Sequence, residues 1–220
     1  MAAKRYDSFW ARNGLSIVVL ACMLASLAGQ VITGHRVYNQ ELLKLGALPM
    51  TFGAYLTTGH FVSATFENWE SEFLQMGMYV LLSVSLRQKG SAESRPMSPS
   101  QETERIEKGQ KPWPVRAGGR WKALYAHSLS TAFFVLFLVS FALHLAGSWR
   151  RENVERVHEG DSPISLMAYG QTSQFWFESF QNWQSEFLAV GALVLVSIWL
   201  RQKDSPQSKP VDAPHSQTGT

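Results

Sequence analysis

Cysteine is almost missing from this sequence: Cys22 is the single one among 220 residues. An intramolecular disulfide and a cysteine-based zinc or iron–sulfur site are therefore excluded. Familiar catalytic signatures are missing too, because the sequence has no Gly-rich phosphate loop, no HExxH and no G-x-S-x-G. These absences predict that the protein is not an enzyme and carries no cofactor.

Charge is missing from two long stretches. Residues 13–34 contain no formal charge, and in residues 123–149 only His127 and His144 can become positively charged. Each stretch is long enough to cross a bilayer, which takes roughly 20 predominantly apolar residues. The lipid bilayer is therefore the first expected partner. A net charge of only +3, with basic residues between the apolar stretches, argues against nucleic acid as another.

The second half of the sequence repeats the first. A shift of 114 residues aligns 13–96 with 127–210 without a gap and gives 32 identities over 84 positions. The strongest match joins FENWESEFLQ, which starts at Phe66, to FQNWQSEFLA, which starts at Phe180. Each copy contains two apolar blocks. The sequence therefore predicts an all-α membrane protein with four transmembrane helices in two parallel tandem repeats (2+2).

The predicted organisation follows from these blocks. Repeat 1 covers 13–96, with spans at about 13–34 and 69–87, and repeat 2 covers 123–210, with spans at about 126–148 and 183–201. The remaining segments are a cytoplasmic N-terminus (1–12), a mobile cytoplasmic linker (97–122) with one helical turn near Glu102–Lys108, and a disordered cytoplasmic tail (203–220). The linker and tail contain too few apolar residues to form a core.

Lysine and arginine are distributed unevenly between the two sides that this organisation creates. Residues 1–12, 87–122 and 201–220 contain fifteen of them, whereas residues 35–66 and 148–178 contain five. Cytoplasmic loops carry the excess of basic residues in membrane proteins. The predicted topology is therefore N-in/C-in.

The repeated motif supplies the first candidates for a functional or interfacial role. They are Asn68, Trp69, Glu72, Asn182, Trp183 and Glu186. Tryptophan favours the membrane interface, asparagine is a good helix N-cap, and a carboxylate in the first turn suits the helix dipole. The motif is therefore predicted to begin the second span of each copy. In the alternative interpretation, the two glutamates face each other and bind a cation or relay protons.

Two further sets of polar residues are equivalent in the two copies. Gln30 and His144 form a lower-ranked pair that is expected to make an interhelical hydrogen bond. The other set joins Arg36, Asn39 and Glu41 to Arg150, Asn153 and Glu155. It is interpreted as a solvated network, with a ligand-binding mouth as the alternative. No histidine has a histidine at its equivalent position, so a metal site built from both halves is disfavoured and none is predicted.

The motif NWxSEF, followed by an apolar helix and LRQKxS, resembles a family of bacterial integral membrane proteins that carry a domain of unknown function. The resemblance covers most of the chain and implies a multi-pass protein of the bacterial inner (cytoplasmic) membrane. It brings no activity, substrate or catalytic residue. The two copies differ at Glu70 and Gln184, which argues against a role that needs this carboxylate in both halves.

These observations favour a non-catalytic scaffold or partner-binding protein. Its expected partners are the bilayer and a second copy of the chain or another membrane protein. The alternative is a small oligomeric transporter or channel subunit that uses the paired polar residues of the two repeats. Four spans enclose little space, so this alternative requires oligomerisation.

Overall fold

The chain folds into helices and turns. A computed structural model describes residues 8–98, 100, 102 and 106–219, and no strand occurs in this part. Its helices are α1 (Phe9–Lys44), α2 (Phe52–Tyr55), α3 (Gly59–Ser85), α4 (Trp113–Ala117), α5 (Gly119–Ala126), α6 (Ser128–Glu159), α7 (Leu166–Tyr169) and α8 (Ser173–Val196). Residues 1–7 of the predicted N-terminal segment, 103–105 of the predicted helical turn and residue 220 of the tail lie outside the described residues.

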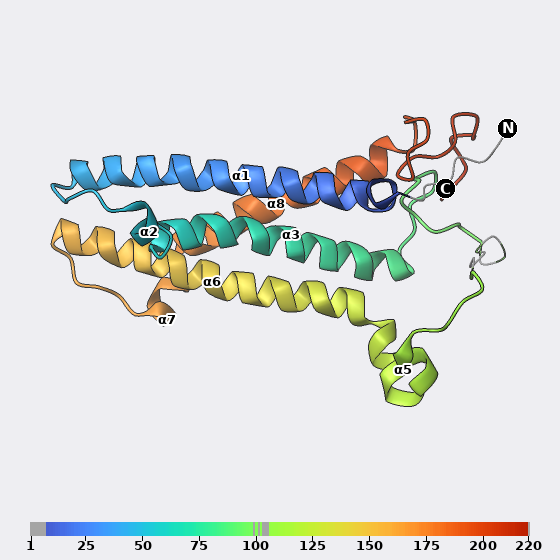
Figure 1. Cartoon of the computed structure of the whole chain (residues 1–220), viewed down its shortest axis with the longest axis horizontal. Coiled ribbons are helices and arrows are strands. Elements are labelled where there is room, and N and C mark those ends of the chain that lie inside the picture. The colour runs from blue at the N-terminus through green and yellow to red at the C-terminus, as the bar shows by residue number, and fades with distance from the viewer. Residues whose placement is uncertain (1–7, 99, 101, 103–105, 220) are drawn as a thin grey trace.

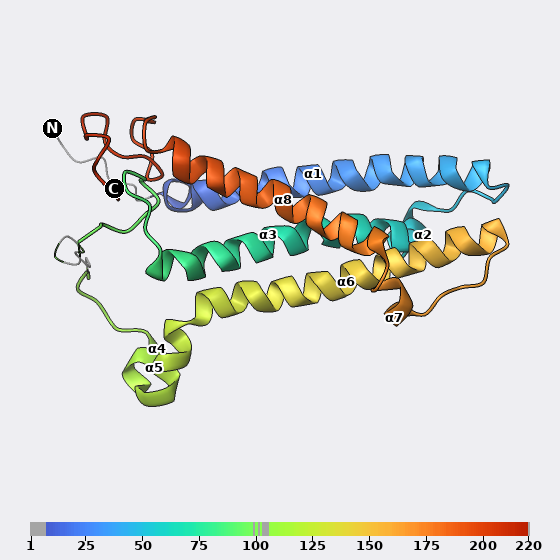
Figure 2. The same ribbon diagram turned by 180° about the vertical axis from the view of Figure 1, so that it is seen from behind.

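Four long helices lie along one another, and α3 is the central one. It packs against α6 on one side and α8 on another (Figures 1 and 2). The connections that contain α2 and α7 lie at one end of the long helices, which we call the loop end. The start of α1, the described part of the tail after α8 and the loop that follows α3 lie toward the opposite end (Figure 1). The all-α prediction is therefore confirmed.

The helices α3 and α8 begin earlier than the motif predicts. Their N-caps are Thr58 and Thr172, whose side-chain oxygens accept hydrogen bonds from the backbone N–H three residues later. The prediction that Asn68 and Asn182 cap these helices is wrong. Both amides instead donate to the carbonyl four residues earlier in the same helix, because the chain is already helical there.

The helices also differ in length from the predicted spans. α3 has 27 residues and α8 has 24, which corresponds to roughly 40 and 36 Å at about 1.5 Å per residue. α1 and α6 continue to Lys44 and Glu159, well beyond the apolar blocks. α6 ends where Gly160 adopts a left-handed conformation with φ 86°. Of the described helices, α1 and α6 are long and apolar enough to cross a membrane.

The bundle is polar inside and apolar outside. Leu42, Tyr55, Ala92, Tyr169 and Phe175 are the buried hydrophobic residues of the described chain. The polar residues buried along α3, α6 and α8 are more numerous: Ser63, Thr65, Glu70, Ser71, Gln75, Ser140, His144, Ser148 and Ser179. Leucine side chains cover the outside instead. This distribution is the reverse of the usual core of a water-soluble protein.

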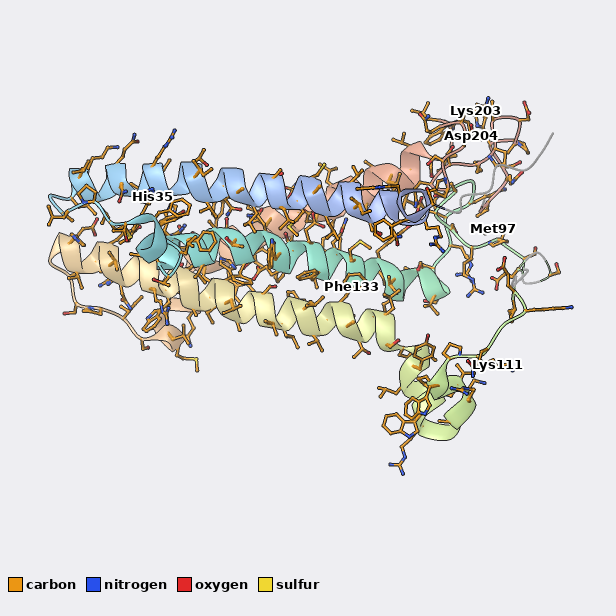
Figure 3. The ribbon with its side chains drawn as sticks, viewed as in Figure 1. His35, Met97, Lys111, Phe133, Lys203 and Asp204 are labelled. Carbon is orange, nitrogen blue, oxygen red and sulfur yellow. The ribbon has the colours of Figure 1, made fainter. Side chains whose placement is uncertain are left out.

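Glycines allow α3 and α6 to approach at the level of their backbones. A Cβ atom on Gly147 would lie 2.5 Å from the backbone nitrogen of Ser63, and one on Gly59 would lie 2.5 Å from the carbonyl oxygen of Gly147. Small residues at such contacts are typical of close helix pairs in membranes. Further along the same pair, Phe133 of α6 packs over Gly77 of α3 (Figure 3).

Several local contacts recur at a separation of 114 residues. Asn39 Oδ1 accepts a hydrogen bond from Met50 N, and Asn153 Oδ1 accepts one from Ile164 N, both at 2.8 Å. The N-caps of α2 and α7, Thr51 and Ser165, are equivalent in the same way. After α3 and α8, Arg87 and Arg201 each donate to three preceding carbonyls at matching positions.

The end of the bundle opposite the loop end holds the linker and the tail. α4 and the start of α5 lie in the last part of the predicted linker. The described part of the tail folds back toward the loop after α3. Lys209 is 1% exposed because its ammonium group donates to the carbonyls of Gly90, His215 and Gln217. These bonds satisfy the buried charge and hold the tail against the loop after α3.

Candidate functional site

A cluster of ionisable side chains lies between α3, α6 and α8, toward the loop end. Its members, which we call the charged cluster, are Glu67 and Glu70 of α3, His144 and Arg151 of α6, and Glu178 of α8. The two α3 residues are three apart, and the two α6 residues are seven apart, so each pair shares a helix face. The backbone contact of Gly147 with Ser63 is one turn away from both His144 and Glu67, so this contact brings the cluster together.

The imidazole of His144 is the centre of the cluster and is fully buried. Its Nδ1 lies 3.0 Å from Glu70 Oε2. Glu70 is fully buried as well, and its other oxygen accepts a hydrogen bond from Trp183 Nε1 at 3.2 Å. A carboxylate can only accept, so Nδ1 is the nitrogen that carries the proton. Trp183 and Glu70 thus orient the ring of His144.

The other ring nitrogen, Nε2, has no hydrogen-bond partner among the described residues. It faces two carboxylates, with Glu178 Oε2 at 3.5 Å and Glu67 Oε2 at 3.7 Å. Glu67, His144 and Glu178 each offer one ligand atom, and these atoms all lie within 4.8 Å of one another. An unpaired buried polar atom normally costs free energy, so this arrangement calls for a ligand or a proton.

Glu178 links the cluster to the loop end of the bundle. Arg151 Nη2 donates to Glu178 Oε1 at 2.5 Å, and Gln174 Nε2 donates to the same oxygen at 2.9 Å. Ser148 donates to the second oxygen at 3.3 Å. The three glutamates and one arginine leave a formal charge of −2 with a neutral imidazole, or −1 with a protonated one. Uncompensated charge in a buried site is costly, so the cluster favours a cation.

An open cleft of about 260 Å³ lies next to the cluster, between α1 and α6. It is lined by Tyr38, Glu41, Leu42, Lys44, Leu45, Arg151, Val154, Glu155 and Glu159. Glu41 and Glu155 are equivalent in the two repeats, and here they line one cleft. Arg151 belongs to both the cleft and the cluster. The cleft therefore brings three glutamates, one lysine and one arginine together at the loop end.

Two buried tyrosines of the short helices close the loop end of the bundle. Tyr55 of α2 and Tyr169 of α7 are each 1% exposed. Burial raises the pKa of Tyr55, and the Glu41 carboxylate adds to this effect. Burial, together with the nearby Glu178 carboxylate, raises the pKa of Tyr169 to about 12. Both phenols therefore stay neutral at physiological pH and contribute no negative charge to the site.

The structure places the candidates in different surroundings, although the Glu72 and Glu186 carboxylates remain close enough to interact electrostatically. His144 belongs to the cluster and Trp183 contacts it, whereas Trp69 packs edge-to-face against Phe66. Glu72 is exposed, and the backbone carbonyl of Glu186 accepts from Gln75 Nε2 at 3.2 Å. Gln30 and His144 are not bonded to each other, but each makes an interhelical hydrogen bond to α3: the Gln30 amide donates to Thr65 Oγ1 at 3.4 Å, and His144 Nδ1 donates to Glu70.

Sequence reasoning missed Glu67, Glu70 and Glu178 because it looked for residues that both copies share. Their equivalents are Gln181, Gln184 and Ala64, and His144 and Arg151 correspond to Gln30 and Val37. The charged cluster therefore exists in only one of two equivalent places. The cluster could have been found from the positions at which the two copies differ. At the positions of the cluster, ionisable residues in one copy replace neutral residues in the other, and all of them lie between α3, α6 and α8.

Comparison with curated proteins and with solved structures gives no match. Comparison with protein families matches residues 6–220 to one described as a domain of unknown function, DUF6766. The prediction that a domain of unknown function covers most of the chain is thus confirmed. The match covers all four long helices and every residue of the charged cluster. The chain belongs to the DUF6766 family.

Proposed function

We propose that this is a four-span protein of the bacterial inner membrane that binds a cation in the charged cluster and acts as a subunit of a small cation carrier. The observation that carries the proposal is the excess of negative charge, on partly buried carboxylates, around the buried and unpaired Nε2 of His144. Ionisable residues inside a membrane bundle are costly and normally mark an ion or proton site.

The reversed distribution of polar and apolar residues supports the membrane location. Leu15 is 82% exposed and Leu188 is 65% exposed, whereas Glu70 and His144 are fully buried. In water such a surface would aggregate, but in lipid it is the favourable one. All four long helices exceed the roughly 30 Å hydrocarbon thickness at about 1.5 Å per residue.

The recurring contacts support the parallel duplication and the N-in/C-in topology. The matching Asn39 and Asn153 bonds tie equivalent loops to equivalent helices, and both loops lie at the same end (Figure 1). The start of α1 and the described tail lie toward the other end, and the excess of lysine and arginine in the segments there supports a cytoplasmic location for that end. The cleft then opens toward the periplasm.

Partner binding without transport is the second candidate function. It is favoured by α1, whose most apolar stretch has no buried residue. A Cβ atom on Gly29 would meet nothing within 4 Å among the described residues, so this face is free for a second copy of the chain. Oligomerisation through α1 is compatible with the carrier as well.

Cation flux into proteoliposomes tests the carrier. Vesicles loaded with an ion-sensitive dye are challenged in turn with Zn²⁺, Mn²⁺, Ca²⁺, Na⁺, K⁺ and a proton gradient. We expect protein-dependent flux of at least one cation, reduced at least ~10-fold in Glu67→Gln because a charged ligand is lost. The double variant Glu72→Gln with Glu186→Gln should keep the flux.

Comparing Glu67→Gln with the double variant shows which acidic residues bind the cation, those of the charged cluster or those of the repeated motif. If the double variant stops the flux and Glu67→Gln does not, the carboxylates of the repeated motif bind the cation, and the charged cluster is not the site. If no cation on this panel enters the vesicles, the carrier proposal is wrong and partner binding becomes the better account.

A further inference from the structure

We propose that Glu67, His144 and Glu178 are the protein ligands of a divalent transition-metal ion of the Zn²⁺ type. This inference rests on the cation-binding part of the proposed function and not on transport. Two observations carry it independently of the acidity of the cluster. They are the spacing of the three ligand atoms and the orientation of the His144 ring.

The spacing fits a shared metal ion better than a hydrogen bond. His144 Nε2 lies 3.5 Å from Glu178 Oε2 and 3.7 Å from Glu67 Oε2. Good N–H···O bonds are shorter, at about 2.7–3.2 Å. Two ligand atoms bound at about 2.0–2.1 Å to a tetrahedral Zn²⁺ are roughly 3.3–3.4 Å apart. Both distances from Nε2 are thus within a few tenths of an ångström of the tetrahedral value, and the three ligand atoms all lie within 4.8 Å of one another.

The hydrogen bond from His144 to Glu70 selects, for the neutral ring, the tautomer that a metal needs. The ring Nδ1–H donates to Glu70, so the lone pair of the neutral imidazole is on Nε2. That nitrogen is fully buried, unpartnered and directed at the other two ligands. Glu70 is held in turn by Trp183. A carboxylate that accepts from the distal nitrogen of a histidine ligand is the usual support of a protein-bound metal ion.

Ligand chemistry and charge select the class of metal. One imidazole and two carboxylates suit Zn²⁺ and its neighbours, whereas Mg²⁺ and Ca²⁺ prefer oxygen ligands alone. No thiolate is present to favour Cu⁺. A divalent ion also neutralises the formal charge of −2 that the cluster has with neutral His144. Three protein ligands leave at least one coordination position for water.

The side chains of Glu67 and Glu178 are not sealed off, at 23% and 13% exposure, while His144 is fully buried. An ion can therefore reach the carboxylates first and then the imidazole. The equivalent set in the other half, Gln181, Gln30 and Ala64, contains neither a carboxylate nor an imidazole. We therefore expect about one metal ion per chain rather than two.

Metal retention by the purified full-length chain in detergent tests the site. The protein is stripped with a chelator, loaded with Zn²⁺ and passed through a desalting column, and the retained metal is measured by mass spectrometry. We expect about one Zn²⁺ per wild-type chain. His144→Gln, which copies the equivalent Gln30, should weaken binding by more than the roughly 10–100-fold that loss of a supporting residue costs.

His158→Gln is the matched control, because His158 is an exposed histidine of the same helix. It should retain Zn²⁺ like the wild type. Glu67→Gln is the second ligand variant, chosen because Glu67 is only partly buried and its loss is less disruptive to folding. Co²⁺ in place of Zn²⁺ should give the strong visible absorption of a four- or five-coordinate site, and this absorption should disappear in both ligand variants.

A folded wild-type chain that retains no Zn²⁺ or Co²⁺ would overturn the proposal. His144 would then be an imidazolium held by carboxylates. The proposal also falls if both ligand variants retain the metal like the wild type, or if His158→Gln loses it equally. Metal retention without vesicle flux would leave the site intact and remove the carrier. Flux without metal retention would support the carrier and rule out the metal site.

Discussion

A Gly147→Ala variant should unfold at a temperature about 4–8 °C below that of the wild type. The added Cβ would lie 2.5 Å from the backbone nitrogen of Ser63, and a backbone cannot rotate away as a side chain can. Overpacking of this kind typically costs about 1–3 kcal/mol, and about 2 kcal/mol shifts Tm by roughly 4–8 °C for a chain of this size. Thermal unfolding followed by circular dichroism in detergent measures the effect.

Gly191→Ala is the matched control, since Gly191 also lies within a long helix and nothing described lies within 4 Å of a Cβ atom built on it. Alanine favours a helix by up to about 1 kcal/mol over glycine, so this variant should unfold at an equal or higher temperature. The same substitution, glycine to alanine, should therefore lower the unfolding temperature at position 147 and not at position 191. If Gly147→Ala were as stable as Gly191→Ala, the close approach of α3 and α6 would be incorrect.

Glu70→Leu should destabilise the protein by about 3–5 kcal/mol, the usual cost of breaking a buried charge pair by removing one partner. Glu70 is fully buried and accepts hydrogen bonds from both His144 Nδ1 and Trp183 Nε1. Leucine cannot accept either hydrogen bond, so the two donors would lose their partner. Chemical unfolding monitored by tryptophan fluorescence gives the free energy of unfolding.

Glu72→Leu is the control for this change, because Glu72 is two residues further along α3 and exposed. It should leave the free energy of unfolding within about 0.5 kcal/mol of the wild type. Glu70→Gln, the residue of the equivalent position 184, should fall between the two, since its amide oxygen keeps one acceptor. Equal stability of Glu70→Leu and Glu72→Leu would mean that Glu70 is not buried between the helices.

Much of the architecture could be predicted from the pattern of residues. The uncharged blocks that became α1 and α6 are long enough to identify by length and composition. The starts of α3 and α8 could not be identified in this way, because Asn68 and Asn182 are as plausible N-caps as Thr58 and Thr172. Only the structure shows that α3 and α8 begin more than one turn before the motif.

The site was harder to predict because its ligands are far apart in the sequence and differ between the repeats. His144 was recognised only as the partner of Gln30, and the symmetry argument set aside a metal site built from both halves. The two halves also differ in the glycines that bring α3 and α6 together. The equivalents of Gly147 and Gly59 are Thr33 and Ser173, so the repeat does not conserve this glycine contact.

Labelling of single cysteines in intact cells tests the topology of the whole account most directly. In a Cys22→Ser background, one variant carries Asp161→Cys in the loop before α7 and another carries Lys108→Cys between α3 and α4. A thiol reagent that does not cross membranes should label position 161 in intact cells and position 108 only after lysis. Labelling of position 108 in intact cells, or recovery of the protein from the soluble fraction, would contradict a four-span bundle with both ends in the cytoplasm.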